Sequence, residues 1–291
     1  MTDIEPLNEE RKRSVAAVFD SGASTYDRVG SRFFSHFGQR LVEIVQPKEG
    51  SRVLDVATGR GAILFPVVKR LGNNGYVIGI DISPAMVKET TYEITQLGFT
   101  NVEASIMDVE DMHFPDGSFD YVLCGFGLAF FPQLGRALSE CRRVLSSGGR
   151  FAATCFVDGE NLGFPWVRSW LSANLPPQIL QKVISQIAKP RLADPWLKTP
   201  ELKSVISEAG FKDVEVFSEE AEFVFDSVEE WWAMLNSIPP VRAMLGILEK
   251  EEDPKIMERL KADAAERLKN HRQEDGYHHS ITALVVQAEV D

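Results

Sequence analysis

The chain has 291 residues, of which 44% are hydrophobic and 25% are charged, a composition typical of a folded globular protein. Its formal net charge of −12 argues against a nucleic-acid partner, because contact with phosphates usually needs a basic surface. No apolar stretch is long enough to span a membrane and the start lacks the apolar region of a signal peptide, so we expect a cytoplasmic protein.

The three cysteines, Cys124, Cys141 and Cys155, have no paired or metal-ligand spacing. Two fall in expected strands and one on the apolar face of an expected helix. We therefore expect buried, reduced thiols and no metal site.

The first segment, 1–50, is expected to be a helical lid. Residues 1–13 are polar and charged, which predicts a frayed or mobile start. From Val15 to about Val45, apolar residues recur at helical spacing, and residues 21–24 interrupt the pattern. Two helices joined by a bend are expected.

The next segment, 51–157, alternates between apolar runs and amphipathic stretches, separated by short glycine-containing connections. Ser83-Pro84 supplies a helix start and Gly98 a helix stop, while Gly148-Gly149 is expected to end a helix at 133–145. The expected strands are 52–57, 76–81, 102–106, 119–124 and 150–156, and the other expected helices are 63–71 and 84–97. This rhythm predicts an α/β fold, a Rossmann-like doubly wound core with helices on both faces of a mostly parallel sheet.

The remainder divides into four segments. A helical insertion is expected at 158–198, with a helix at 177–188, followed by a continuation of the core at 199–226 that contains extended chain from Val214 to Phe225. A second helical insertion is expected at 227–276, and 277–291 supplies the last core strand, at 281–288. The sheet would then have seven strands, and the insertions would lie over the carboxyl edge, where such folds bind ligands.

The glycine loop Val56-Ala57-Thr58-Gly59-Arg60-Gly61 follows the first strand, and Asp81 ends the second. Glycines there allow a tight turn and close approach of the backbone to a ligand, and Asp81 is placed to accept hydrogen bonds from both ribose hydroxyls. Leu64 stands where a dinucleotide fingerprint has glycine or alanine, and Asp55 would repel a pyrophosphate but attract an ammonium or sulfonium. S-adenosylmethionine (SAM) is therefore favoured over NAD.

Four motifs in order, including Met107 to Asp120 and Leu145 to Phe151, resemble the class I SAM-dependent methyltransferases, and most closely the ubiquinone/menaquinone-biosynthesis-like group. The resemblance covers about 15–157. It implies that Asp55 attracts the amino group of SAM, Asp81 the ribose, and Asp108 the exocyclic amine of adenine. The cofactor-binding residues that it implies are Tyr26, Asp55, Ala57, Thr58, Gly59, Gly61, Asp81, Ile82, Met86, Met107, Asp108, Val109 and Gly125.

Methyl transfer from a sulfonium needs mainly positioning and exclusion of water, so a catalytic dyad is not required. The candidate bases are His36, His278 and His279, for each of which a solvent-facing or core role is the alternative. A turn role is expected for His113.

Aromatic residues are dense in the lid segments and predict either an acceptor pocket or packing of the lid onto the sheet. They are Phe33, Phe34, Phe37, Trp166, Trp170, Trp231 and Trp232.

The expected function is methyl transfer from SAM to a small, apolar or aromatic acceptor, such as a secondary metabolite or a quinone-like precursor. The alternative is a SAM-binding protein that does not methylate, in which the cofactor is structural or assists a cyclisation or rearrangement. An NAD-dependent enzyme is a third interpretation. The identity of the acceptor stays open, as does a homodimer formed through the lid helices.

Overall fold

The computed structural model describes residues 4–156, 170, 173–179, 181, 199–250 and 255–291. Its centre is one sheet with the strand order β3-β2-β1-β4-β5-β8-β6, to which the short β7 is added by pairing with β8. The strands are β1 (Arg52–Val56), β2 (Tyr76–Asp81), β3 (Val102–Ile106), β4 (Phe119–Gly125), β5 (Leu145–Phe156), β6 (Lys212–Phe225), β7 (Arg272–Gln273) and β8 (Gly276–Glu289). Strands β1 to β5 pair in parallel, and β8 runs antiparallel to both β5 and β6. The predicted fold class is confirmed.

Helices cover both faces of this sheet, as a parallel sheet requires. Helices α2 and α3 pack on one face, against residues such as Val53 and Leu123, and α5 and α8 pack on the other, against residues such as Leu54 and Phe151. The α-helices are α1 (Ile4–Gly22), α2 (Phe33–Val45), α3 (Leu64–Leu71), α4 (Pro84–Leu97), α5 (Leu134–Val144), α8 (Thr199–Glu208), α9 (Val228–Ser237), α10 (Pro239–Leu248) and α11 (Ile256–Leu268). Short 3₁₀ turns occupy Gly72–Asn74, Leu128–Phe130 and Lys269–His271.

The chain order creates a switch point between β1 and β4. From β1 the chain proceeds outward through β2 to β3, and it then returns to the other side of β1 as β4. In folds of this kind the connections after two such strands leave in opposite directions, and ligands bind at the carboxyl ends of the strands beside the switch point. The glycine loop lies there.

Local signals in the sequence place the helix α4 correctly. Ser83 precedes it, and the Ser83 hydroxyl accepts a 3.1 Å hydrogen bond from the backbone N–H of Met86, while Pro84 occupies the first turn. Gly98 ends the helix in the left-handed conformation, with φ of 70°.

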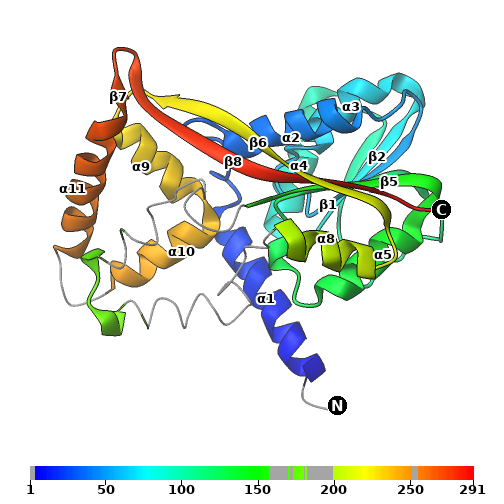
Figure 1. The fold of residues 1–291 in the computed structure, drawn as a ribbon, viewed down its shortest axis with the longest axis horizontal. Helices are drawn as coiled ribbons and strands as arrows, with labels where there is room; N and C mark the ends of the chain where they lie inside the picture. The colour runs from blue at the N-terminus through cyan, green and yellow to red at the C-terminus, as the bar shows by residue number, and fades with distance from the viewer. Residues whose placement is uncertain (1–3, 157–169, 171–172, 180, 182–198, 251–254) are drawn as a thin grey trace.

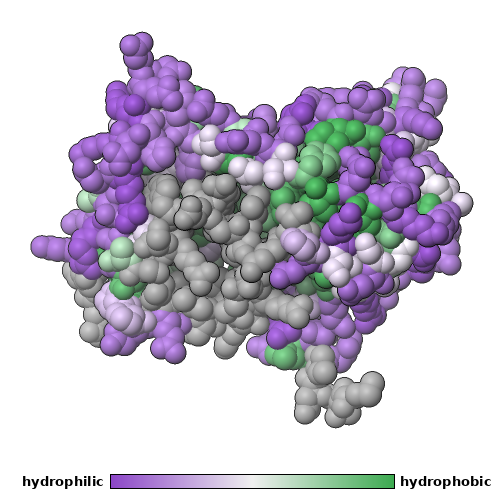
Figure 2. Space-filling view, viewed as in Figure 1, coloured by the Kyte–Doolittle hydropathy of each residue, from purple (hydrophilic) through white to green (hydrophobic). Residues whose placement is uncertain are grey.

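Strands β6 and β8 extend beyond the sheet as a two-stranded ribbon. The pairing of β8 with β5 ends at Phe156 and Ala283, whereas its pairing with β6 continues to Phe225 and Tyr277. Figure 1 shows the ribbon reaching toward α9 and α11, and the surface around α11 and β7 is mostly hydrophilic in Figure 2. In the region of the predicted second helical insertion, the chain between β6 and β8 contains α9, α10 and α11.

Three details of the predicted elements are wrong. Residues 4–13 are part of α1 and are not frayed, because Lys12 is buried in ion pairs with residues of the core. Helix α5 ends at Val144, so Gly148-Gly149 does not stop it and lies inside β5, near a register shift in the pairing with β4. The last strand begins at Gly276 rather than Ile281, because β6 provides a partner for this longer stretch.

The insertion expected at 158–198 falls largely outside the described residues. Residues 177–179 and 181 of the helix expected at 177–188 are helical, and the rest of that helix, like Trp166, lies outside them. The proposed segment boundaries stay predictions. Within the described part of the chain, no helix is both long and apolar enough to cross a membrane.

Candidate functional site

The glycine loop has an unusual backbone. Ala57, directly after β1, has a φ of 54°, and Gly59 and Gly61 have φ of 51° and 78°. The left-handed conformation costs a residue with a side chain roughly 1–2 kcal/mol, and such strain concentrates at functional sites. The backbone N–H of Thr58 donates to the carbonyl of Ile80 at 2.9 Å, which ties the loop to β2.

Tyr26 lies over this loop. A Cβ placed on Gly59 would lie 3.5 Å from Cε1 of Tyr26, so the tyrosine ring covers the loop backbone directly. The ring also contacts Phe19 and Phe34, with centroid distances of 6.2 Å and 4.8 Å. Tyr26 therefore joins the glycine loop to the aromatic side chains of α2.

Asp55 is a buried acid with a spare acceptor. It is 1% exposed, and its Oδ2 accepts a 2.6 Å hydrogen bond from the hydroxyl of Thr58. Its Oδ1 has no hydrogen-bond partner among the described residues. Burial raises the pKa of Asp55 to about 7, although the Thr58 hydrogen bond opposes that change. A buried carboxylate oxygen without a partner is costly unless a cation or another donor reaches it.

Asp81 fastens the loop to the start of α4. Its Oδ2 accepts a 2.8 Å hydrogen bond from the backbone N–H of Gly59, and its Oδ1 accepts a 2.9 Å bond from the backbone N–H of Ser83. Burial raises the pKa of Asp81 to about 6, with a further contribution from the nearby Asp20. A carboxylate oxygen can accept two hydrogen bonds, so each oxygen of Asp81 can still accept one from a hydroxyl group.

Asp108 follows β3, and the pairing of β2 with β3 brings it close to Asp81. The backbone N–H of Met107 donates to the carbonyl of Asp81 at 3.1 Å. Oδ1 of Asp108 accepts from the backbone N–H of Glu110 at 2.8 Å, and Oδ2 lies 2.7 Å from Nζ of Lys12. Nothing in the sequence marks Lys12 as part of the site, because residues 1–13 are polar and charged and predict a frayed start.

A cleft of about 670 Å³ lies between α1 and the ends of β2 and β3. It brings together three of the predicted cofactor residues, Ile82, Met107 and Asp108, with Asp20 and Lys12 on the α1 side. His113 lies on its rim as an exposed turn residue. The other ten predicted cofactor residues are not among the residues that line this cleft: Tyr26, Asp55, Ala57, Thr58, Gly59, Gly61, Asp81, Met86, Val109 and Gly125. The side chains of Met86 and Val109 are buried.

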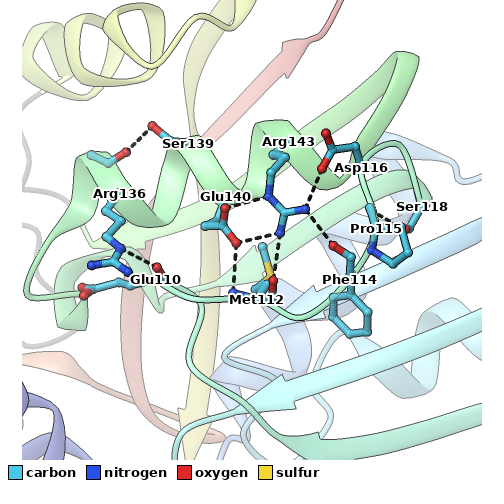
Figure 3. Close-up of polar contacts among 11 residues, drawn as sticks. Glu110, Met112, Phe114, Pro115, Asp116, Ser118, Arg136, Ser139, Glu140 and Arg143 are labelled. Carbon is cyan, nitrogen blue, oxygen red and sulfur yellow. Dashed lines mark hydrogen bonds and ion pairs between the residues drawn. The ribbon is translucent and has the colours of Figure 1, made fainter.

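Helix α5 holds the segment that carries Asp108. Arg143 donates to the carbonyls of Phe114 at 2.7 Å and Met112 at 2.9 Å, and Glu140 accepts from the backbone N–H of Met112 at 2.9 Å (Figure 3). Arg136 of the same helix donates to the carbonyl of Glu110 at 2.7 Å (Figure 3). The loop after β3 is thus fixed along its length.

At the end of β4, Gly125 and Phe126 complete the edge. A Cβ on Gly125 would come 3.0 Å from Cδ1 of Ile63, so the backbone is close to the residue that precedes α3. Phe126 has a φ of 58°, and its backbone N–H donates to the carbonyl of Thr154 at 3.0 Å. The strained backbone points its ring into a cluster with Phe34 and Phe156, at centroid distances of 5.4 Å and 4.6 Å.

The aromatic residues for which either an acceptor pocket or packing of the lid onto the sheet is predicted lie together where the structure describes them. One hydrophobic cluster contains, among others, Phe33, Phe34, Phe37, Phe126, Trp170 and Trp231, with Trp232 packed against it. It spans α2, the end of β4 and the lid helices, so the lid and the sheet edge share this core.

The structure does not bring the three candidate histidines to the cleft. His36 is exposed on α2, with its ring against Phe37 and Phe223. His278 lies between Asp275 and Glu222 on the ribbon, at 2.7 Å and 3.1 Å, and the hydrogen bond that Asp275 accepts from it raises its pKa. His279 is buried beside His271, and burial lowers its pKa to about 4.

Among the described residues, no group of histidine, cysteine or acidic side chains has the arrangement of a metal site. The three cysteines are buried and free, as predicted.

Comparison with known proteins places this arrangement in a family. Residues 5–228 match the ubiE/COQ5 methyltransferase family. The chain is 38% identical to the aklanonic acid methyltransferase DauC of Streptomyces sp. (strain C5), over 65% of this chain and 87% of that protein. It is 34% identical to the nocamycin O-methyltransferase of Saccharothrix syringae, over 76% of this chain and 81% of that protein.

A similar fold occurs in the structure of phosphoethanolamine N-methyltransferase 2 from Haemonchus contortus in complex with SAM. The TM-score is 0.56 at 17% identity, and the match covers 93% of this chain and 57% of the other.

Proposed function

The chain belongs to the ubiE/COQ5 methyltransferase family, and from this premise we propose that it transfers the methyl group of SAM to a small apolar or aromatic acceptor. The relatives named for aklanonic acid and nocamycin support an acceptor of this size. In the proposal, SAM lies along the carboxyl edge from the glycine loop to Asp108, and the acceptor lies under the aromatic cluster of the lid.

The observation that carries the proposal is the spare oxygen of Asp55. It is buried at the end of β1, beside the glycine loop, in a place where a positively charged amino group would satisfy it. The same buried carboxylate is unfavourable for a pyrophosphate, which argues against NAD. The donor chemistry of the site therefore fits SAM.

The other predicted cofactor residues take roles that follow from their positions. Asp81 would accept hydrogen bonds from the ribose hydroxyls. Ile82 and Met107 would flank the adenine, and Asp108 would accept a hydrogen bond from its exocyclic amine. Tyr26 would cover the ligand from the α2 side.

The backbone of Ala57, Thr58, Gly59 and Gly61 would face the methionine part of SAM, and Gly125 would lie beside its sulfur. Met86 and Val109 would support the adenine site from the core rather than touch it.

When bound, SAM supplies a methyl group already activated by the positive sulfur. The residues of the chain then have to hold the acceptor in line and exclude water, an effect that supplies on the order of 7–11 kcal/mol in oriented reactions. The rings of Phe34, Phe126 and Phe156 form an apolar wall next to Gly125 that suits this task.

We assign proton removal to none of the three histidines. His36 is exposed, His278 is held by two acids, and the low pKa of His279 makes it a weak base. A homodimer and the absence of a nucleic-acid partner stay predictions.

Methyl-labelled SAM tests the proposal. The protein is incubated with labelled SAM and either aklanonic acid or a demethylated menaquinone precursor, and the label is followed into the organic phase. We expect labelled product and an equal amount of S-adenosylhomocysteine (SAH). Binding of SAM by calorimetry, without transfer of label to these or to extracted small molecules, would favour the alternative of a SAM-binding protein that does not methylate.

A further inference from the structure

Lys12 is a buried cation at the edge of the cofactor cleft. Its Nζ lies 2.7 Å from Oδ2 of Asp108 and 2.9 Å from Oε2 of Glu110. The Lys12 side chain is 8% exposed and that of Glu110 is fully buried. Buried lysines occur almost only with acidic partners, because an unpaired charge away from water is very costly. Helix α1 thus provides the counter-charge for two acids of the loop after β3.

The contacts of Lys12 fix the orientation of Asp108. The Asp108 carboxylate is held at Oδ1 by the backbone N–H of Glu110 and at Oδ2 by Lys12. Glu110 is itself fixed, because its Oε1 accepts from the backbone N–H of Gln133 at 2.6 Å and its carbonyl accepts from Arg136. The Asp108 carboxylate is therefore held in one orientation, and Lys12 is one of the two groups that hold it.

Lys12 is itself charged at neutral pH. Burial lowers the pKa of Lys12, but the hydrogen bonds with Asp108, Glu110 and Glu9 outweigh it, so the pKa is raised above its ordinary value and the ammonium persists at neutral pH. Without that ammonium, the carboxylates of Asp108 and Glu110 would lose the cation that they share.

We propose that Lys12 is a positioning residue for the nucleoside of the cofactor. It holds Asp108 as an oriented acceptor for the exocyclic amine of the adenine, and in this way it sets the preference of the site for adenine. The inference rests on the proposed function, because it takes Asp108 to be the acid that meets the base. It assigns to α1 a direct part in cofactor selection.

The test measures base preference as well as affinity. Calorimetry compares SAH with S-inosylhomocysteine, in which a carbonyl replaces the exocyclic amine, on the wild type, Lys12→Met, Lys12→Arg and the exposed charge control Lys48→Met. We expect Lys12→Met to weaken SAH about tenfold and to reduce the preference for SAH over the inosyl ligand, whereas Lys12→Arg retains most of both. The Lys48→Met protein should bind as the wild type does.

A loss shared equally by both ligands, or no loss, would overturn the inference while leaving SAM binding intact. Failure of the wild type to bind SAH would instead contradict the proposed function. The two failures are therefore distinguishable.

One double variant controls for a folding defect, and a double-mutant cycle tests whether Lys12 acts through Asp108. Lys12→Met leaves the buried carboxylate of Glu110 without its cationic partner. Lys12→Met/Glu110→Gln therefore provides a second protein in which the charge of Glu110 is also removed. In an Asp108→Asn background, Lys12→Met should weaken SAH less than about threefold, because its partner is already neutral. Fully additive losses would show that Lys12 does not act through Asp108.

Discussion

The backbone N–H of Gly59 donates a 2.8 Å hydrogen bond to Oδ2 of Asp81, which joins the glycine loop after β1 to the acid at the end of β2. The same carboxylate accepts from Ser83 at the start of α4. The shape of the loop and the position of the ribose acid are therefore one structural unit. A substitution of Asp81 should therefore alter the conformation of the glycine loop, and a substitution of Gly59 should alter the position of the Asp81 carboxylate.

Thr58 is expected to tune the buried acid Asp55. Thr58→Val keeps the side-chain shape but removes the 2.6 Å hydrogen bond to Asp55, and hydrogen bonds to charged groups contribute about 1.5–3 kcal/mol. The free energy of unfolding should fall by an amount in this range. SAH should also bind more weakly at pH 7, measured by calorimetry, because Asp55 then takes up a proton more readily. Thr58→Ser retains the hydroxyl and should bind nearly as the wild type; equal losses in both variants would contradict the role of the hydrogen bond.

Binding should depend on pH through the acids of the site. The ammonium group of SAH needs an ionised Asp55, and its ribose hydroxyls need an ionised Asp81 as acceptor. Burial raises the pKa of Asp55 to about 7 and of Asp81 to about 6, so affinity should fall as the pH falls through this range. Ionisation of Asp55 alone predicts that SAH binds about eightfold more tightly at pH 7.5 than at pH 6.

In Asp55→Asn this part of the pH dependence should disappear. An unchanged pH profile in that variant would show that Asp55 is not the titrating group.

Gly38 of α2 is expected to be essential for the contact of that helix with the chain before α3. A Cβ there would lie 2.3 Å from the carbonyl oxygen of Ala62, a backbone atom that cannot move without displacing the glycine loop. Gly38→Ala should lower the free energy of unfolding by about 1–3 kcal/mol, as measured in denaturant. The matched control is Gly135→Ala in α5, where a Cβ meets nothing within 4 Å and should be neutral or slightly stabilising; a similar loss there would refute the steric explanation.

Elements with local signals could be predicted from the sequence. The strand β2 and the helix α4 have the predicted ends because Asp81, Ser83-Pro84 and Gly98 mark them within a few residues. The proximity of Asp55, Asp81 and Asp108 also follows from sequence, since the carboxyl ends of neighbouring parallel strands meet at one edge.

Features that depend on distant partners could not be predicted in this way. The start of α1 is ordered by Lys12, whose partners Asp108 and Glu110 lie about a hundred positions away. The early start of β8 at Gly276 depends on β6, because its first residues are not strongly apolar. Likewise, only the folded chain shows that Phe126 has a strained backbone, because the residue type gives no sign of it.

The most direct test of the account is calorimetric titration of SAH into the wild type and Asp81→Ala. Asp81 is placed to accept the ribose hydroxyls and to hold Gly59, so its removal should weaken binding by about 2–3 kcal/mol, the scale of charge-assisted hydrogen bonds. Thermal unfolding of both proteins checks that the variant is folded. Tight binding to the wild type with that loss in the variant is the predicted result, and equal binding to both proteins would contradict the placement of the cofactor at this edge of the sheet.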